Sequence, residues 1–217
     1  MNSAKINTYI FDFDGTLVDS MPYWSEKMMR ILRKSGVGYP SDVIKIITTL
    51  GDAGTARYFR ETLGVTYSDD EMFEMMDGYA IPMYRDVIPA KDGVAEYLTM
   101  LKNAGCSLNV LTASPHKAVD PCLKRLGMYG MFDNVWSTDD FGLPKSDVRI
   151  YHEAVKRIGT DIGNAAFFDD NIGAVRTSKA AGLYTVGVYD DTAKDFTEEM
   201  KSTADIYVRS FRELTLL

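Results

Sequence analysis

The chain has 217 residues, of which 46% are hydrophobic, and a formal net charge of −7 at pH 7. This length and composition suit one large domain, or a core with a smaller second unit. The negative charge argues against nucleic acid or an anionic membrane as the main partner, because both attract basic faces. The chain begins without a signal-peptide pattern and has no apolar run long enough to span a membrane, so we expect a cytoplasmic protein.

The first predicted element is a short strand that ends in the run Phe11-Asp12-Phe13-Asp14-Gly15-Thr16-Leu17. Asp12 and Asp14 are two residues apart, so their side chains are expected to project to one side where the strand ends. Gly15 and Thr16 are small and let backbone N–H groups face a ligand. Paired carboxylates at the carboxyl end of a strand suit Mg²⁺, a cation that prefers oxygen ligands.

Between residues 19 and 89 the pattern contains helices only. Two stripes of apolar residues recur at helical spacing, and a capping box at Ser68–Glu71 begins a helix with a methionine-rich face. We expect these methionines to pack in the core of the helical segment rather than to form a flexible binding surface. The two stripes are Trp24, Met28, Ile31 and Leu32, and Val43, Ile46, Ile47 and Leu50; the methionine-rich face consists of Met72, Met75, Met76, Tyr79 and Met83.

The second half of the chain alternates between strands and helices. This alternation predicts an α/β fold, with a doubly wound parallel sheet covered on both faces. The helices-only stretch, inserted straight after the first strand, predicts an α-helical cap domain. The predicted boundaries are 1–18 and 90–217 for the Rossmann-like core domain and 19–89 for the helical cap domain. The predicted strands are Ser107–Leu111, Val135–Ser137, Ala165–Phe168, Tyr184–Val188 and an edge strand at Ile206–Val208, and the helices are 117–126, 147–158 and 172–181.

Polar residues also follow two later strands. Thr112, Ala113 and Ser114 offer hydroxyls and backbone N–H groups that can hold a phosphate oxygen. Asp169 and Asp170 end a buried strand, where they can complete the oxygen shell of a metal ion. Two adjacent carboxylates would repel each other without a cation, which also argues for a metal.

The pattern Asp-x-Asp-Gly-Thr, beginning at Asp12, resembles the nucleophile motif of the haloacid dehalogenase superfamily. The segment from Lys145 to Tyr151 is similar to the Lys-Pro-x-Pro-Asp-x-x-x-Tyr segment of many relatives, although Ser146 and Val148 replace residues that are often proline. The acidic pair that ends the strand at Phe168 resembles the Glu-Asp-Ser of other members. The resemblance is closest to the subfamily with a helical cap between the first two motifs, which includes phosphoglycolate phosphatases, sugar-phosphate phosphatases and β-phosphoglucomutase.

The resemblance implies a Mg²⁺-dependent phosphatase that forms an aspartyl-phosphate intermediate. Its substrate would be a small phosphorylated metabolite, such as a sugar phosphate or phosphoglycolate, and the protein a monomer or weak homodimer. The implied catalytic residues are the nucleophile Asp12, the general acid and base Asp14, and the phosphate-holding Thr112 and Lys145. The implied metal site consists of Asp12, Asp14 through its backbone carbonyl, Asp170, and Asp169 either directly or through a metal-bound water. The implied phosphate- and substrate-binding residues are Gly15, Thr16, Ala113 and Ser114.

Two cap residues are candidate substrate contacts. Thr49 lies in a turn between predicted cap helices and Arg57 just beyond it, and an exposed helix surface is an equally good interpretation of both. In this subfamily the cap covers the active site and contributes substrate contacts.

Three alternatives differ in the residues that they require. Mutases of this subfamily carry an acid–base histidine after the nucleophile motif, but the window Asp19–Glu26 contains none, and Trp24 lies about where it would fall. A non-catalytic binding protein would be signalled by the loss of Asp12, Asp14 or Lys145, and all three are present. A dehalogenase needs no metal, which would leave Asp14 and the acidic pair unexplained. Hydrolysis of a phosphate ester is therefore favoured.

Overall fold

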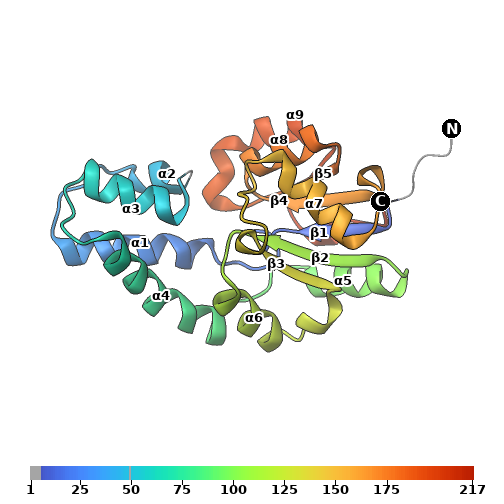
Figure 1. Ribbon diagram of the computed structural model, residues 1–217, viewed down its shortest axis with the longest axis horizontal. Helices are drawn as coiled ribbons and strands as arrows, with labels where there is room; N and C mark the ends of the chain where they lie inside the picture. Colours follow the sequence, from blue (N-terminus) through green and yellow to red (C-terminus); the bar gives the residue numbers. More distant parts are fainter. Residues whose placement is uncertain (1–5, 49) are drawn as a thin grey trace. The chain divides into compact units, whose positions relative to one another are not determined.

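The computed structural model describes residues 6–48 and 50–217 (Figure 1). They form two compact units. The first consists of the described residues up to Asp19 together with Pro89–Leu217, and the second of Ser20–Ile88. Thr49, one of the two candidate substrate contacts in the cap, lies outside the described residues.

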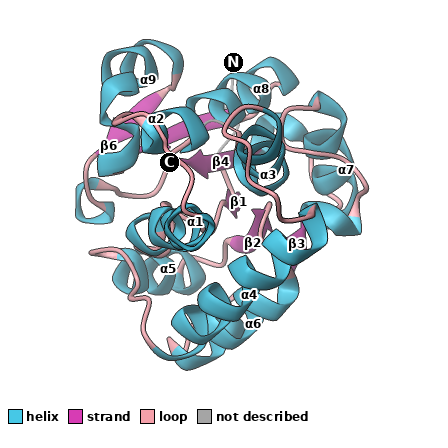
Figure 2. Cartoon of the chain, turned by 90° about the vertical axis from the view of Figure 1, so that its left-hand side faces the viewer, coloured by secondary structure: helices cyan, strands magenta, loops and turns pink. Residues whose placement is uncertain are grey.

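The first unit is built on a six-stranded sheet in the order β3-β2-β1-β4-β5-β6, in which all neighbours are parallel. Figure 2 shows β4, β1, β2 and β3 side by side in this order. The chain adds β2 and β3 on one side of β1 and the later strands on the other, so the order reverses at β1, where such sheets bind ligands. The strands are β1 (Thr8–Phe11), β2 (Ser107–Thr112), β3 (Asn134–Ser137), β4 (Ala165–Asp169), β5 (Tyr184–Val188) and β6 (Ile206–Val208).

Helices cover both faces of this sheet, with α7 and α8 on one side and α5 and α6 on the other (Figure 1). Alternate residues of the central strands point to opposite faces. Ile10 and Phe167 pack with Tyr151 of α7, whereas the Phe11 and Phe168 rings contact each other on the opposite face, tilted by 37° with centroids 4.6 Å apart. The predicted α/β fold is therefore confirmed. The helices are α5 (Val94–Asn103), α6 (His116–Arg125), α7 (Val148–Ile158), α8 (Ile172–Ala181) and α9 (Thr197–Thr203).

The described residues of the second unit form four helices around an apolar core. As predicted, a capping box begins the last helix: the Ser68 hydroxyl accepts a hydrogen bond from the Glu71 N–H at 3.2 Å, and the Ser68 N–H donates to the Glu71 carboxylate at 2.8 Å. The core combines Met28, Ile31 and Phe59 with the predicted methionines Met72 and Met76. The helices are α1 (Met21–Ser35), α2 (Val43–Thr48), α3 (Gly51–Glu61) and α4 (Asp69–Asp86).

The structure corrects parts of the predicted apolar stripes. Leu50 is 41% exposed because α2 ends at Thr48, so the helical spacing no longer directs its side chain inward. On α4, Met75 is half-buried, and Tyr79 and Met83 line a groove of about 710 Å³ against α1 rather than lying in the core. The methionine-rich face is therefore only partly a core face.

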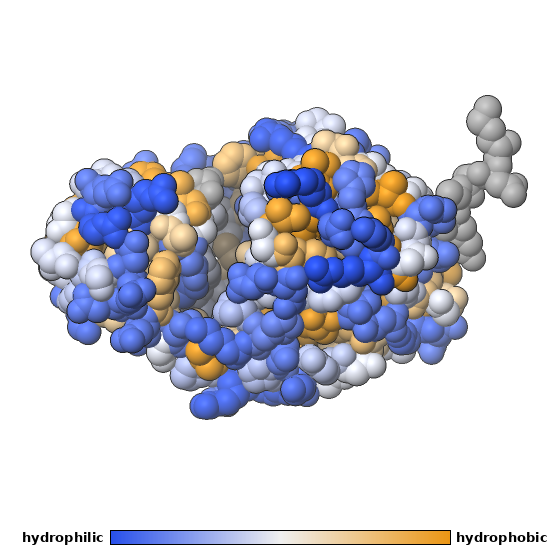
Figure 3. Space-filling model, in the orientation of Figure 1, coloured by the Kyte–Doolittle hydropathy of each residue, from blue (hydrophilic) through white to orange (hydrophobic). Residues whose placement is uncertain are grey.

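The face of the molecule drawn in Figure 3 is mixed in polarity. On the face shown in Figure 3, hydrophobic residues lie in small patches between hydrophilic ones. Among the described residues, no helix has both the length and the hydropathy that a membrane span requires.

Candidate active site

The candidate site begins where β1 ends, at the centre of the sheet. Asp12 is the next residue, and its N–H donates to the carbonyl of Phe168 at 2.8 Å, so the backbone stays paired with β4. Only 4% of Asp12 is exposed. The chain then turns at Gly15, whose φ is +72° and whose N–H donates to the carbonyl of Val18 at 3.0 Å. A tight turn thus follows directly on a buried carboxylate.

Three buried carboxylates, those of Asp12, Asp169 and Asp170, form an acidic cluster. One oxygen from each lies within 4.8 Å of the others. The sheet register explains their proximity, because Phe11 of β1 lies opposite Phe168 of β4, so Asp12 and Asp169 follow paired residues at the same end of two adjacent strands. The two adjacent strands therefore gather acidic residues that are far apart in the sequence.

Hydrogen bonds fix the orientation of the two later carboxylates. The Thr16 hydroxyl accepts from the Asp170 N–H at 3.1 Å and donates to the Asp170 carboxylate at 3.2 Å. Asp169 accepts from the N–H of Asn171 at 2.7 Å. Thr16 is fully buried, so in this structure it orients an acid of the cluster.

Lys145 bridges two members of the acidic cluster. Its ammonium lies 2.7 Å from a carboxylate oxygen of Asp12 and 2.7 Å from one of Asp169. The Tyr151 hydroxyl donates to the backbone carbonyl of Lys145 at 2.9 Å, which holds this segment in place although it lacks the family's prolines. Lys145 is thus a cation directed at the predicted nucleophile.

The acidic cluster is electrostatically unbalanced. The pKa of Asp12 is raised to about 7, mainly by burial and also by the carboxylates of Asp169 and Asp14, while the Lys145 ammonium acts in the opposite direction. Burial, together with the carboxylates of Asp169 and Asp12, also raises the pKa of Asp170. Burial alone would lower the pKa of Lys145, but the carboxylates of Asp12 and Asp169 raise it well above its ordinary value. The site therefore holds more negative charge than its lysine neutralises.

Asp14 is not one of the three clustered carboxylates and contacts the second polar segment. Its carboxylate accepts a hydrogen bond from the Ser114 hydroxyl at 2.5 Å. The Thr112 hydroxyl, 1% exposed at the end of β2, accepts from the Ser114 N–H at 3.1 Å. Ala113, between them, is exposed. The structure thus brings Ser114 to the predicted acid and base, and Thr112 to the same strand end.

Gly15 is required by close approach as well as by backbone conformation. A Cβ atom at this position would lie 2.5 Å from a carboxylate oxygen of Asp170, and the φ of Gly15 disfavours other residues. Any side chain here would displace a carboxylate of the acidic cluster.

Among the described residues, the donor set of the acidic cluster fits a hard divalent cation. All available side-chain ligands are carboxylate oxygens, which hard divalent cations prefer. Three carboxylates and one ammonium have a net charge of −2 when all are ionised, which a divalent cation balances.

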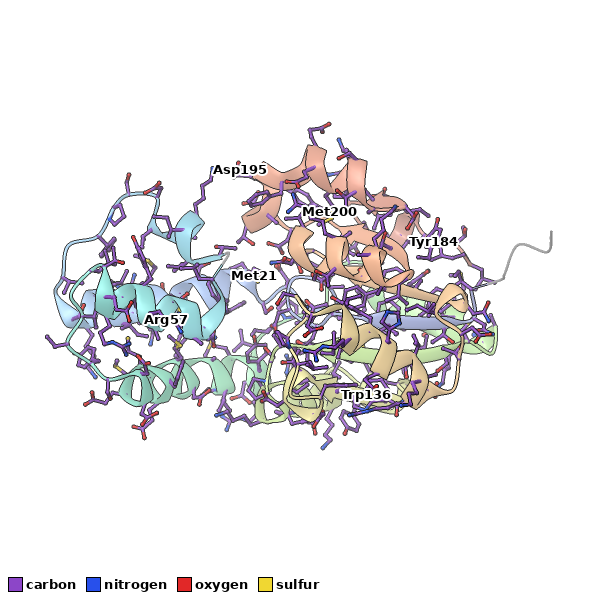
Figure 4. All side chains as sticks on the ribbon, turned by 45° about the horizontal axis from the view of Figure 1, so that its top comes forward. Met21, Arg57, Trp136, Tyr184, Asp195 and Met200 are labelled. Atoms are coloured by element: carbon purple, nitrogen blue, oxygen red, sulfur yellow. The ribbon has the colours of Figure 1, made fainter. Side chains whose placement is uncertain are left out.

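The structure also reveals residues that sequence reasoning missed. Lys91 donates to the carbonyl of Gly15 at 2.5 Å and to the carboxylate of Asp190 at 2.9 Å. Neither Lys91 nor Asp190 belongs to a recognisable motif, and 99 positions separate them in the sequence, so no local pattern indicated the contact. The predicted substrate contact Arg57 is an exposed residue of α3 in the second unit, labelled in Figure 4.

The fold and the site define a class: α/β proteins with an acidic cluster at the carboxyl ends of the central parallel strands. The model of the family "Haloacid dehalogenase-like hydrolase" matches residues 9–188. The chain belongs to this family, which confirms the resemblance found in its motifs.

Relatives and solved structures agree with this assignment. The chain is 27% identical to validoxylamine A 7'-phosphate phosphatase of Streptomyces hygroscopicus subsp. limoneus, over 94% of each chain. It is 25% identical to hexitol phosphatase B of Escherichia coli (strain K12), over 97% of this chain and 95% of the relative. The crystal structure of CbbY from Rhodobacter sphaeroides with phosphate superposes with a TM-score of 0.83 at 21% identity, over 96% of each chain.

Proposed function

We propose that this protein is a Mg²⁺-dependent phosphatase that hydrolyses the phosphate monoester of a small carbohydrate-like metabolite. The observation that carries the proposal is the buried cluster of Asp12, Asp169 and Asp170 with Lys145 bonded to two of its members. Similarity to named phosphatases over nearly the whole chain supports the same reaction.

In the proposed mechanism Asp12 is the nucleophile. A carboxylate oxygen of Asp12 attacks phosphorus, the bond between phosphorus and the ester oxygen breaks, and an aspartyl-phosphate forms. Lys145 lies at the same carboxylate, where its charge offsets that of the incoming phosphoryl group. The hydroxyl of Thr112 and the N–H groups beyond it would hold the other phosphate oxygens.

Asp14 carries out the proton transfers in this proposal. It gives a proton to the leaving alkoxide, then takes one from the water that attacks phosphorus and releases inorganic phosphate from Asp12. Its hydrogen bond from Ser114, at 2.5 Å, orients the carboxylate for both steps.

The metal would be held by the carboxylates of Asp12 and Asp170 and the carbonyl of Asp14, with Asp169 as a further ligand or a partner of a bound water. When bound, Mg²⁺ neutralises phosphate oxygens and brings them to the nucleophile. In its absence the raised pKa of Asp12, about 7, leaves part of the protein with a protonated and unreactive Asp12 at neutral pH.

The substrate class is inferred from the relatives, whose names refer to a hexitol and to validoxylamine A 7'-phosphate. We therefore infer a phosphorylated polyhydroxy compound as the substrate. We further propose that the second unit is the cap domain of this subfamily and that Thr49 and Arg57 contribute to substrate choice.

The proposal is tested by phosphate release from a panel of hexitol phosphates, sugar phosphates and phosphoglycolate, in Mg²⁺ or EDTA. We expect Mg²⁺-dependent release that falls roughly 10³-fold or more in Asp12→Asn. Asp161→Asn, an exposed position of the same unit, is the matched control and should behave like the wild type. Folded wild-type protein that releases no phosphate from any compound would contradict the proposal, and rearrangement of a sugar phosphate without release would indicate a mutase.

A further inference from the structure

A second buried ion pair lies in the first unit, outside the acidic cluster. The ammonium of Lys91 lies 2.9 Å from the carboxylate of Asp190, and their side chains are 15% and 5% exposed. Asp190 follows β5, and Lys91 follows the point at which the chain returns from the second unit. The proposed mechanism uses neither residue.

The ammonium of Lys91 is held by three hydrogen bonds. It donates to the carbonyl of Gly15 at 2.5 Å, to the carbonyl of Tyr189 at 2.7 Å and to the carboxylate of Asp190 at 2.9 Å. An ammonium has three donors, so each of them has a partner inside the first unit. Asp190 is itself fixed, because its other oxygen accepts from the Thr192 N–H and hydroxyl at 2.9 and 2.6 Å. Lys91 is therefore held in one position.

The backbone around Lys91 is tied to the same turn. The Lys91 N–H donates to the carbonyl of Leu17 at 3.0 Å. Val18 and Ala90 form an antiparallel bridge. The segment that leaves the first unit and the segment that returns to it are thus paired, and this pairing places Lys91 beside the nucleophile turn.

Gly15 lies between Lys91 and the acidic cluster. Its carbonyl accepts from Lys91, while its Cα approaches Asp170 so closely that a Cβ would lie 2.5 Å from a carboxylate oxygen. Gly15 is also covalently bonded to Asp14, the proposed acid and base. A shift of the Gly15 carbonyl would therefore move Asp14 and change the space beside Asp170 together.

We propose that Lys91, fixed by Asp190, is a positioning residue that holds the Asp14–Gly15 turn in the geometry required for phosphoryl transfer. This proposal rests on the proposed phosphatase function. An ion pair that only stabilised the fold would lower the melting temperature of its variants without changing the turn or the turnover of the folded protein. The test therefore measures the turn directly and separates kcat from KM.

The test compares Lys91→Met with Lys102→Met. Lys102 also pairs with an aspartate of the first unit, Asp133, at 2.7 Å, but these side chains are 40% and 44% exposed. Lys91→Met leaves the buried Asp190 without its cation, which can prevent folding. The double variant Lys91→Met/Asp190→Asn removes both charges and replaces the single variant in the test if the single variant does not fold.

The first readout is hydrogen exchange of the Gly15 amide in EDTA-treated protein. This N–H bonds to the carbonyl of Val18 within the turn. If the turn is loosened in the Lys91 variants, the Gly15 amide should exchange about tenfold faster or more. In Lys102→Met its exchange rate should be unchanged. The second readout is turnover in Mg²⁺. We expect kcat to fall about 10- to 100-fold while KM changes less than about threefold, because the phosphate-holding residues are untouched.

Faster Gly15 exchange together with lower kcat would support the proposal. Folded Lys91 variants with wild-type exchange, or with faster exchange but unchanged kcat, would overturn it. If wild-type protein has no phosphatase activity, the proposed function fails, and exchange alone then decides whether Lys91 holds the turn.

Discussion

The two units differ in the charge that they bury. Among the described residues, the first unit buries the carboxylates of Asp12, Asp169, Asp170 and Asp190. In the described part of the second unit the one buried charged residue is Lys27, and its partner Asp52 has a side chain that is 44% exposed. Burying charge costs free energy, so clustered buried acids are typical of a site kept for chemistry. The difference supports our proposal that the reaction takes place in the first unit, while the second is held together mainly by apolar contacts.

The largest expected effect contrasts the lysines of the two units. Lys145→Met removes the cation bonded to Asp12 and Asp169, so kcat/KM should fall roughly 10²- to 10³-fold. Lys27→Met removes a similarly buried ammonium bonded to Asp52 at 2.7 Å, and we expect it to lower the melting temperature with less than about a threefold change in kcat. Steady-state kinetics and thermal melts measure both. Equal losses of kcat in the two variants would contradict the division between the units.

A matched pair of glycines sharpens the comparison. Gly15 and Gly36 have nearly equal φ values, +72° and +70°, so alanine at either position carries a left-handed strain of about 1–2 kcal/mol. Only at Gly15 would the new Cβ meet a neighbour, the Asp170 carboxylate, whereas nothing lies within 4 Å at Gly36. Both alanine variants should melt at lower temperature, but only Gly15→Ala should lose activity, by about 10- to 100-fold. Wild-type kinetics in Gly15→Ala would show that Asp170 is not in the reaction centre.

The smallest effect concerns stability against pH. The folded-state pKa of Asp12, about 7, lies above its ordinary value of 3.8. Protonation of Asp12 therefore contributes fully to stability below pH 3.8, and this contribution is lost as the pH rises through about 7. EDTA-treated protein should therefore melt a few degrees lower at about pH 8 than at about pH 5.5. The drop should be smaller in Asp12→Asn, and Mg²⁺ should stabilise the wild type more at the higher pH.

Other groups also titrate in this range. Hydrogen bonds to Asp140 and Asp120 raise the pKa of His116, which weakens stability in the same direction as the pH rises. This contribution is common to the wild type and Asp12→Asn, so the difference between their two curves reports Asp12 together with Asp170, whose pKa the Asp12 carboxylate also raises. Identical curves would contradict the raised pKa of the nucleophile.

Local sequence patterns were enough to predict the fold and to indicate which acidic residues lie together at the candidate site. The predicted bounds of α8, β5 and β6 coincide with the observed ones, because Gly182 ends α8 and short apolar runs mark the strands. The proximity of Asp12 and Asp169 could be predicted from the sequence, because Asp12 follows a strand, Asp169 ends one, and parallel strands end at the same edge of a sheet.

Long-range contacts and irregular chain geometry could not be predicted. The ion pair between Lys91 and Asp190 depends on how two loops meet in space. Leu50 has the right spacing for an inward-facing residue, but α2 ends before it. α9 went unassigned because Met200 is its one buried residue among those described, too few to produce an apolar period.

The measurement that tests the central claim most directly is chemical trapping of the aspartyl-phosphate. Mg²⁺-loaded protein is mixed with the best substrate of the panel, quenched in acid and treated with borohydride, which reduces an acyl phosphate to an alcohol. Peptide mass spectrometry should then locate homoserine in place of Asp12, and only in samples that received substrate. Reduction at another carboxylate, such as Asp14, or no trapped residue in protein that accumulates the intermediate during turnover, would contradict the assignment of Asp12 as the nucleophile.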